Sequence, residues 1–318
     1  MRVLIVKTSS MGDVVHTLPA VSDLLRYHPE ATVDWLVETP FAAIPQLHPG
    51  VAQVLPMAWR KWRHKLAERD TWRAMGAVRQ QMRSKPYDLV LDLQGLVKSA
   101  LWGLQARGAL VGYDRSSLRE PMAALFYQRT ARVPRELHAV ERCRRLTALH
   151  LGYVMPQSAP DFGLRAPTKT WRTPEPYAVL IPNASRPEKL WPEARWMTLG
   201  RKLHALGFTP VVLWGNEAEQ TLAERIAAGC SGTVPPFLKV GEMAAVLAGA
   251  RCVVGLDTGF SHLAAAFGRP TVGIYCDHEP GLAGITGAGP VASIGGKGQV
   301  PKLADVAALL DKLLAQST

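Results

Sequence analysis

The sequence has few cysteines, and none of them forms a closely spaced pair. Four occur in 318 residues, Cys143, Cys230, Cys252 and Cys276, and no Cys-x-x-Cys motif is present. This spacing argues against a disulfide framework and against a structural zinc site. Reduced thiols are typical of cytoplasmic proteins, so a cytoplasmic protein is expected.

Long apolar runs are also missing. No stretch reaches the roughly 20 consecutive apolar residues that a transmembrane helix needs. The apolar run at residues 3–6 is too short for the core of a signal peptide, and Lys7 ends it. We therefore expect a soluble protein, or one bound to a membrane surface at most.

The standard nucleotide and metal motifs are absent. Neither a Gly-x-Gly-x-x-Gly turn nor a P-loop follows a strand-like run, which disfavours a dehydrogenase. No His and carboxylate cluster has metal-ligand spacing, and the neighbours Asp277, His278 and Glu279 form too weak a pattern to count. An enzyme of this sequence that acts on a diphosphate is expected to neutralise its leaving group without a metal ion.

Acidic residues are outnumbered. The chain has 37 Lys and Arg against 26 Asp and Glu, a formal charge of +11. Such an excess indicates an anionic partner, which could be nucleic acid, anionic lipid or a phosphorylated substrate. The alternative is that the charge serves solubility alone. With 47% hydrophobic residues the chain is expected to be folded rather than disordered.

The N-terminal half alternates aliphatic runs with amphipathic segments. Residues 2–7 form a continuous aliphatic run of the kind found in buried parallel strands, and residues 14–26 have helical periodicity. Together with the run at 33–37 they predict a β-α-β unit. Further strands are predicted at residues 51–56, 88–93 and 110–113. This half is therefore expected to be an open parallel sheet with helices on both faces.

Five prolines between residues 156 and 176 predict a linker, because proline neither continues a helix nor donates to a sheet. The predicted domains are residues 1–160 and 161–318. The second half repeats the α/β rhythm, with strands at 177–182, 209–214, 252–256 and 271–275 and helices at 193–206, 217–228, 243–250, 261–267 and 303–314. The expected fold class is α/β, with two Rossmann-like domains facing across a cleft. Whether the terminal helix packs back on the first domain is left open.

Residues 7–13 follow the first predicted strand, where open α/β sheets bind their ligands. Gly12 allows a close approach of backbone to ligand. Asp13 lies near the start of the following helix, so it is either a catalytic carboxylate or a helix N-cap.

A second candidate site lies at residues 257–262, again between a strand and a helix. The hydroxyl and glycine residues Thr258, Gly259 and Ser261 suit a phosphate cradle at a helix start. His262 is a ligand contact or a structural histidine. Lys189, in the loop after the strand at 177–182, could pair with a phosphate or be a solvated surface lysine.

A basic and aromatic segment at residues 59–65 contains two tryptophans among five cationic or imidazole side chains. This mixture suits a membrane interface or an anionic sugar. The alternative is an amphipathic helix whose tryptophans pack on the sheet.

These residues resemble the bacterial lipopolysaccharide heptosyltransferases, and the resemblance extends along the whole chain. The opening residues 1–14 are similar to the family's start nearly residue for residue, and the blocks that match are residues 92–100, 119–121, 125–127, 138–142, 189–192 and 257–263. The Asp-Thr-Gly-x-Ser-His block is shared across the family. The N-terminal block and the Arg-Glu-Pro block favour the member that acts first on the core over its relatives.

The resemblance implies a GT-B fold, an N-terminal acceptor domain and a C-terminal nucleotide-sugar domain. It implies an inverting transfer of heptose from ADP-heptose to the Kdo (3-deoxy-octulosonic acid) of Kdo2-lipid A, with Asp13 as the general base and no cofactor. The implied donor contacts are Ser185, Lys189, Glu219, Leu238, Met243, Asp257, Thr258, Gly259 and His262. The implied acceptor contacts are Ser10, Gly12, Arg60, Lys61, Arg63, Lys98, Arg119 and Glu120.

The resemblance further implies a monomer on the cytoplasmic face of the inner membrane, held peripherally, without nucleic acid as a partner. The block at residues 275–281 departs from the family pattern, because His278 stands where a hydroxyl residue is expected. The loop at 183–185 also has one hydroxyl residue fewer than expected. A heptosyltransferase that acts later on the core and a non-catalytic protein that binds anionic glycolipid or nucleic acid are the alternatives.

Overall fold

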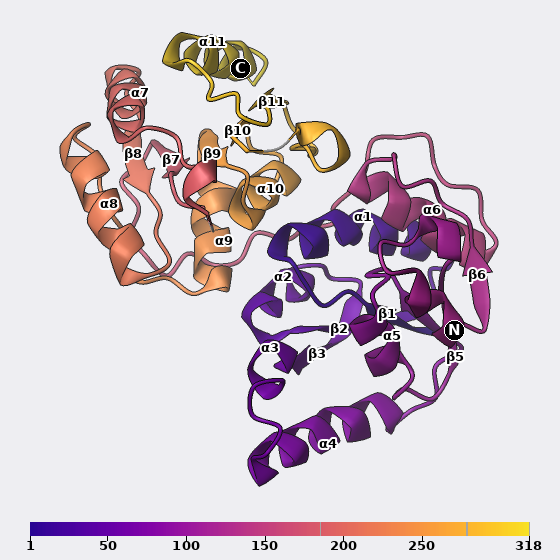
Figure 1. Cartoon of the computed structure of the whole chain (residues 1–318). Coiled ribbons are helices and arrows are strands. Elements are labelled where there is room, and N and C mark those ends of the chain that lie inside the picture. Colours follow the sequence, from indigo (N-terminus) through magenta and orange to yellow (C-terminus); the bar gives the residue numbers. More distant parts are fainter. Residues whose placement is uncertain (185, 278, 318) are drawn as a thin grey trace. The chain divides into compact units, whose positions relative to one another are not determined.

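The computed structural model describes residues 1–184, 186–277 and 279–317. Ser185 and His278, singled out from the sequence, lie outside the described residues. The chain forms two compact units, Met1–Gly163 and Leu164–Thr318. Each is an α/β unit around one parallel sheet (Figure 1), which confirms the predicted α/β class with two parallel-sheet units.

The first unit contains a six-stranded sheet in the order β3-β2-β1-β4-β5-β6, and every pairing is parallel. Its strands are β1 (Arg2–Val6), β2 (Thr32–Glu38), β3 (Val51–Met57), β4 (Leu89–Asp92), β5 (Ala109–Tyr113) and β6 (Arg129–Ala131). Its helices are α1 (Met11–Tyr27), α2 (Ala43–Gln46), α3 (Trp59–Trp62), α4 (Arg69–Arg83), α5 (Val97–Gly103) and α6 (Ala139–Leu151), with short 3-10 turns at Thr39–Phe41, Arg115–Ser117 and Pro121–Phe126.

The burial of β1 fits its central position in the first sheet. The side chains from Val3 to Val6 are fully buried, as expected for a strand covered on both faces. Helices α1 and α6 pack together over one face of the sheet, while α4 and α5 lie on the other (Figure 1). A buried ion pair, with Arg144 Nε 2.6 Å from Asp23 Oδ2, ties α6 to α1.

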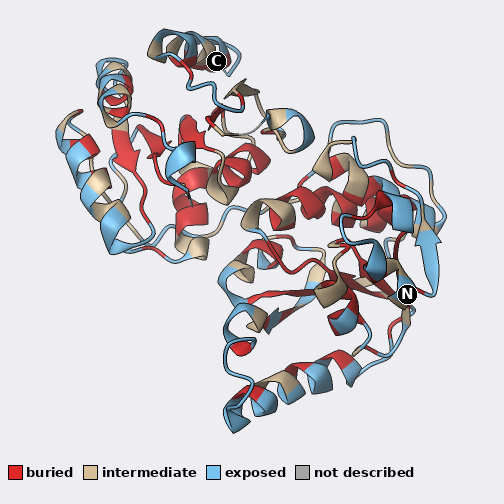
Figure 2. Cartoon of the chain, in the orientation of Figure 1, coloured by how far each residue is buried: buried red, intermediate tan, exposed pale blue. Residues whose placement is uncertain are grey.

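The second unit contains a five-stranded parallel sheet in the order β11-β10-β9-β7-β8. Its strands are β7 (Tyr177–Ile181), β8 (Thr209–Val212), β9 (Val253–Leu256), β10 (Thr271–Tyr275) and β11 (Val291–Gly295). Its helices are α7 (Glu193–Ala205), α8 (Glu217–Ala228), α9 (Val240–Gly249), α10 (Gly259–Ala266) and α11 (Leu303–Ala315), with 3-10 turns at Pro187–Lys189 and Pro280–Leu282. Four of its strands, β7, β8, β9 and β10, are buried almost throughout, whereas β11 at the edge is only partly buried (Figure 2).

The terminal helix α11 packs within the second unit. Its buried residues Val306, Leu310 and Leu313 belong to the same apolar cluster as Trp191 and Trp196, which belong to α7 and the loop before it. The last helix therefore contributes to the core of the second sheet.

The structure differs from the sequence prediction mainly at sheet edges and helix starts. β6 and β11 were not predicted, nor were helices α4, α5 and α6. Helix α1 begins at Met11, three residues earlier than predicted, so Asp13 is inside the helix. Within the described residues, no helix combines the length and the apolar character needed to cross a bilayer.

Candidate functional site

The first candidate site lies at the switch point of the first sheet, where the strand order changes direction. β1 pairs with β2 on one side and with β4 on the other. The connections that follow β1 and β4 therefore lead to helices on opposite faces of the sheet, and this part of the carboxyl edge is where doubly wound sheets bind ligands. The predicted residues Ser10, Gly12, Asp13 and Lys98 all belong to these two connections or the helices that they open.

Asp13 is the third residue of α1 and remains 39% exposed. Its Oδ2 accepts hydrogen bonds from Ser10 N at 2.7 Å and Ser10 Oγ at 2.8 Å. Its Oδ1 lies 3.8 Å from the buried ammonium of Lys7. Ser10, not Asp13, is the N-cap, so the N-cap interpretation of Asp13 was wrong. The carboxylate is thus oriented by Ser10 and Lys7 at the helix start, and it remains partly exposed.

Gln94 holds the loop that carries Ser10. Its side-chain Oε1 accepts hydrogen bonds from Thr8 N and Ser9 N, both at 3.0 Å. Lys7 Nζ donates to Leu93 O at 2.9 Å. The loops after β1 and β4 are therefore cross-linked by side chains, so the position of Asp13 depends on both.

Asp92, the last residue of β4, anchors the second of these loops. Its Oδ1 accepts from the backbone of Gln94 and Gly95 at 2.9 and 3.0 Å. Its Oδ2 accepts from Ser99 Oγ at 2.8 Å and from Tyr127 OH at 2.9 Å. Burial raises the pKa of Asp92, although these four donors oppose the rise. The aspartate fixes the start of α5 and, with it, Lys98.

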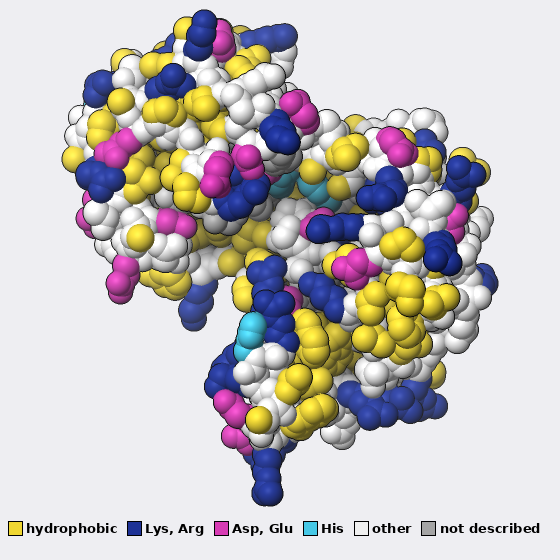
Figure 3. All heavy atoms as spheres, viewed as in Figure 1, with side chains coloured by type: hydrophobic (Ala, Val, Ile, Leu, Met, Phe, Trp, Pro, Cys, Tyr) yellow, Lys and Arg dark blue, Asp and Glu magenta, His cyan; other side chains and the backbone are white. Residues whose placement is uncertain are grey.

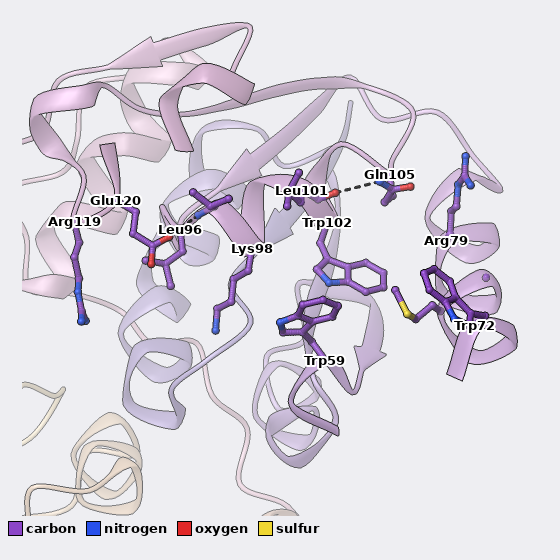
Figure 4. Close-up of a pocket in the computed structure, with 13 residues that line it drawn as sticks. Trp59, Trp72, Arg79, Leu96, Lys98, Leu101, Trp102, Gln105, Arg119 and Glu120 are labelled. Atoms are coloured by element: carbon purple, nitrogen blue, oxygen red, sulfur yellow. Dashed lines mark hydrogen bonds between the residues drawn. The ribbon is translucent and has the colours of Figure 1, made fainter. Parts of the chain in front are cut away.

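Lys98, Arg119 and Glu120 line one pocket in the first unit, together with Trp59 (Figure 4). Glu120 Oε2 accepts a hydrogen bond from Val97 N at 2.8 Å, so this carboxylate secures the first turn of α5. Lys98 Nζ lies 3.5 Å from Ser9 Oγ. The structure therefore brings these three predicted acceptor contacts together, with Glu120 in a positioning role.

The predicted cations at residues 60, 61 and 63 lie on and just after the short helix α3, and all three are exposed. The Arg60 guanidinium lies over the ring of Phe41, 5.3 Å from its centroid. Two tryptophans of this segment, Trp62 and Trp59, pack against Trp102 of α5, with ring centroids 5.8 and 6.3 Å apart.

Glu38 at the end of β2 supports this segment, and the sequence did not single it out. Its side chain is buried, and its Oε1 accepts from Arg60 N at 3.2 Å. Burial raises the pKa of Glu38, while the hydrogen bond and the charge of Arg60, along with Lys98 and Arg63, oppose the rise. A buried carboxylate thus balances the cations that surround it.

The second candidate site lies at the corresponding switch point of the second sheet. β7 pairs with β8 on one side and β9 on the other, so the connections after β7 and β9 diverge. Lys189 belongs to the first connection and Asp257 to the second. Lys189 Nζ donates to Asp257 Oδ2 at 2.7 Å, and each side chain is only 16% exposed. The interpretation of Lys189 as a solvated surface lysine was therefore wrong.

His262 completes this cluster. Its Nε2 lies 3.5 Å from Asp257 Oδ1, and the histidine side chain is 5% exposed. Burial alone would raise the pKa of Asp257, but the hydrogen bonds from His262 and Lys189 outweigh it and lower the pKa to about 2. Asp257 is therefore ionised at neutral pH, and it holds the ammonium and the imidazole in place.

Thr258 is the N-cap of α10, and Gly259 is its first residue. The first backbone N–H groups of a helix have no partner within the helix and favour anions. Ser261 does not contribute to this cradle: its hydroxyl donates to Leu256 O at 2.7 Å. A Cβ on Gly255 would lie 2.2 Å from that hydroxyl, so Gly255 lets α10 pack closely against β9.

The remaining predicted donor contacts lie on α8 and around α9. Glu219 Oε2 accepts from Gly215 N at 2.8 Å, in the loop that opens α8. Leu238 and Met243 are buried. An ion pair that was not predicted, Arg186 with Asp277, joins the loops that follow β7 and β10. No set of three or more His, Cys, Asp and Glu side chains in the described part of the chain could hold a metal ion.

Comparisons with known proteins agree with this geometry. The sequence profile of glycosyltransferase family 9 (heptosyltransferase) matches residues 75–306. Lipopolysaccharide heptosyltransferase 1 of Pseudomonas aeruginosa is 43% identical over 297 residues, which cover 92% of this chain and 83% of that protein. The solved structure of the E. coli heptosyltransferase WaaC with ADP superposes with a TM-score of 0.91 at 39% identity, covering 98% of this chain and 99% of the other.

A second WaaC structure, with ADP-2-deoxy-2-fluoro heptose, gives a TM-score of 0.88 at 38% identity and covers all of both chains. The structural similarity therefore extends over the whole chain. On these grounds the chain belongs to glycosyltransferase family 9, the heptosyltransferases.

Proposed function

We propose that this protein transfers L-glycero-D-manno-heptose from ADP-heptose to the Kdo of Kdo2-lipid A. The main structural support for this reaction is the position of Asp13, a partly exposed carboxylate that Ser10 holds at the switch point of the first sheet. The similarity to heptosyltransferase 1 supports the acceptor, and the WaaC structures with ADP and a fluorinated ADP-heptose support the donor.

The reaction is a direct displacement at the anomeric carbon. An acceptor hydroxyl oxygen forms the new bond to that carbon as the bond to the diphosphate oxygen breaks, which inverts the configuration. The hydroxyl proton passes to Asp13, which acts as the general base. Ser10 donates two hydrogen bonds to Oδ2 of Asp13, and Lys7 lies 3.8 Å from Oδ1, so these two residues hold the carboxylate that we assign as the base.

The second unit stabilises the departing ADP. The negative charge that develops on the diphosphate lies at the N-terminus of α10, near Thr258 and Gly259. Lys189 supplies a positive charge from the neighbouring loop, and Asp257 keeps it in position. Glu219, Leu238 and Met243 hold the adenosine. This arrangement needs no metal ion, so we propose a metal-independent reaction without a cofactor.

The first unit grips the acceptor. The cations Arg60, Lys61, Arg63, Lys98 and Arg119 bind the carboxylates and phosphates of the Kdo-lipid. The same positive surface holds the protein peripherally on the cytoplasmic face of the inner membrane, where this acceptor is assembled. We propose that the monomer suffices, because each predicted contact comes from one chain.

The test is product formation from ADP-heptose and Kdo2-lipid A in EDTA, followed by mass spectrometry. A gain of one heptose establishes donor, acceptor and independence of metal together. Transfer only to an acceptor that already bears a heptose assigns the protein to a later step of core assembly. If neither acceptor consumes the donor, the protein is a binding protein and the proposal is wrong.

A further inference from the structure

A groove of about 1000 Å³ runs between α4 and α5 in the first unit, with Trp59 of α3 at its side (Figure 4). This volume is at the upper end of the range for small-molecule sites. Most of its wall is apolar, formed by Trp59, Trp72, Leu101 and Trp102. Donor chemistry does not use this groove, because the predicted donor contacts all belong to the second unit.

The aromatic walls are held open by their own contacts. Trp102 is packed from behind by Trp62, with ring centroids 5.8 Å apart. The indole N–H of Trp72 donates to Leu66 O at 2.7 Å, which fixes the ring although 58% of the residue is exposed. Leu101 is 46% exposed. Apolar side chains that stay exposed along one concavity mark a binding surface.

Gly76 is the residue of α4 that lines the groove without a side chain. A Cβ built on this glycine meets no atom within 4 Å, so packing does not require a glycine here. Glycine also weakens a helix interior relative to alanine. The residue therefore has no structural benefit inside α4, and its effect is to keep space beside Trp72 and Met75 free.

The cations lie at the ends of the groove. Arg119 and Lys98 are at one end, Trp59 and Trp102 are in the middle, and Trp72 and Arg79 are at the other end (Figure 4). On the face of the first unit shown in Figure 3, apolar side chains likewise gather with Lys and Arg around them. A ligand that matches this pattern has anionic groups joined to a long apolar segment.

We propose that the groove holds an acyl chain of the glycolipid acceptor. This inference rests on the proposed function, because Lys98 and Arg119 are the cations assigned to the anionic sugars of that acceptor. With the sugars at this end, the chain continues along Trp102 and Trp59 toward Trp72. The enzyme then recognises the lipid as well as the sugar, and burial of each methylene favours binding.

The experiment compares kcat/KM for Kdo2-lipid A with kcat/KM for the same acceptor after alkaline removal of its acyl chains, both in the same mixed micelles. The test variant is Gly76→Leu, whose side chain enters free space in the groove. The matched control is Ala77→Leu, on the next residue of α4, which is exposed and outside the groove lining. Circular dichroism checks that both variants keep their helix content.

We expect the wild-type protein to prefer the acylated acceptor. We also expect Gly76→Leu to lower the ratio of the two kcat/KM values about tenfold, which corresponds to about 1.4 kcal/mol, while Ala77→Leu leaves the ratio as in the wild type. If the wild type uses both acceptors but the two variants behave alike, the groove serves another occupant, such as a protein segment, and the inference is overturned while the proposed function stands. If the wild type uses neither acceptor, the proposed function fails and the inference fails with it.

Discussion

The pair formed by Lys189 and Asp257 permits a test that separates stability from donor binding. The perturbation is Lys189→Met, which removes the ammonium and keeps most of the apolar length of the side chain. Asp257 then loses the shorter of its two described contacts, 2.7 Å, and keeps the 3.5 Å contact with His262. A carboxylate that is 16% exposed is left undercompensated.

The size of the effect follows from the pKa of Asp257. The shift from 3.8 to about 2 is about 1.8 pH units, which corresponds to about 2 kcal/mol in favour of the ionised folded state. This is the net effect of His262 and Lys189 after burial has been subtracted. Lys189→Met removes the contribution of Lys189 and leaves that of His262, so it is expected to lower the free energy of unfolding of the second unit by about 1 to 2 kcal/mol at pH 7.

The assay is urea-induced unfolding, monitored by hydrogen exchange in peptides from β9 and α10. These peptides report on the second unit alone, which is needed because a two-unit chain need not unfold in one step. A double-mutant cycle adds Asp257→Asn and the combination with Lys189→Met. The loss of free energy of unfolding in the combined variant is expected to be smaller than the sum of the two single losses by about 1 to 2 kcal/mol. The combined variant is still expected to bind ADP more weakly than the wild type, because the cation that we assign to the diphosphate is missing.

The pH dependence has a definite sign. The folded pKa of Asp257 lies below its unfolded value, so the stability that this group contributes is complete above about pH 4. It is lost as the pH falls toward about 2. The difference in stability between wild type and Asp257→Asn should therefore shrink below pH 4. A coupling under about 0.5 kcal/mol, or a difference that stays constant down to pH 3, would refute this account of the cluster.

Three other substitutions test the rest of the assignment. Asp13→Ala should leave ADP-heptose affinity intact and lower kcat by a factor on the order of 100 or more, measured by steady-state kinetics, and retained turnover would remove Asp13 from the mechanism. Arg119→Ala should raise the KM for the acceptor about tenfold at low salt and less at high salt, with the donor KM unchanged; an equal rise for both substrates would contradict its placement. Gly255→Ala should destabilise the second unit by about 1 to 3 kcal/mol in urea unfolding, because the new Cβ meets Ser261 Oγ at 2.2 Å. A stability equal to that of the wild type would show that α10 can move away from β9 at little cost.

The sequence predicted the central strands because burial on both faces leaves a continuous aliphatic run. β1 and β7 are of this kind, and both were found within one residue of their bounds. β6 has only three residues, two of them exposed, so it carries no such run. β11 is an edge strand whose residues are all only partly buried. Whether an edge segment forms a strand depends on pairing with its single neighbour more than on its own composition.

The site residues were visible in sequence where they follow a strand, but their partners were not. Asp13 and Asp257 stand directly beyond predicted strands. The pairing of Lys189 with Asp257 joins positions 68 residues apart, and no local pattern encodes it. The roles of Glu38 and Asp92 could not be predicted for the same reason, since each depends on loops that only the sheet brings together. The groove was missed because Trp102, Trp72 and Gly76 belong to helices that the sequence did not predict.

The strand order also affects how the chain folds while it is being synthesised. The sheet of the first unit needs distant partners, since Val3 pairs opposite Leu89, yet its last strand ends at Ala131. Residues 164–318 still take roughly 10 to 30 s to add at ~5–20 residues per second. Slow parallel pairing can be complete within that interval. The first unit can thus mature before the second unit is made, and protease resistance of the first unit in ribosome-bound chains stalled at residue 220 would verify this order of events.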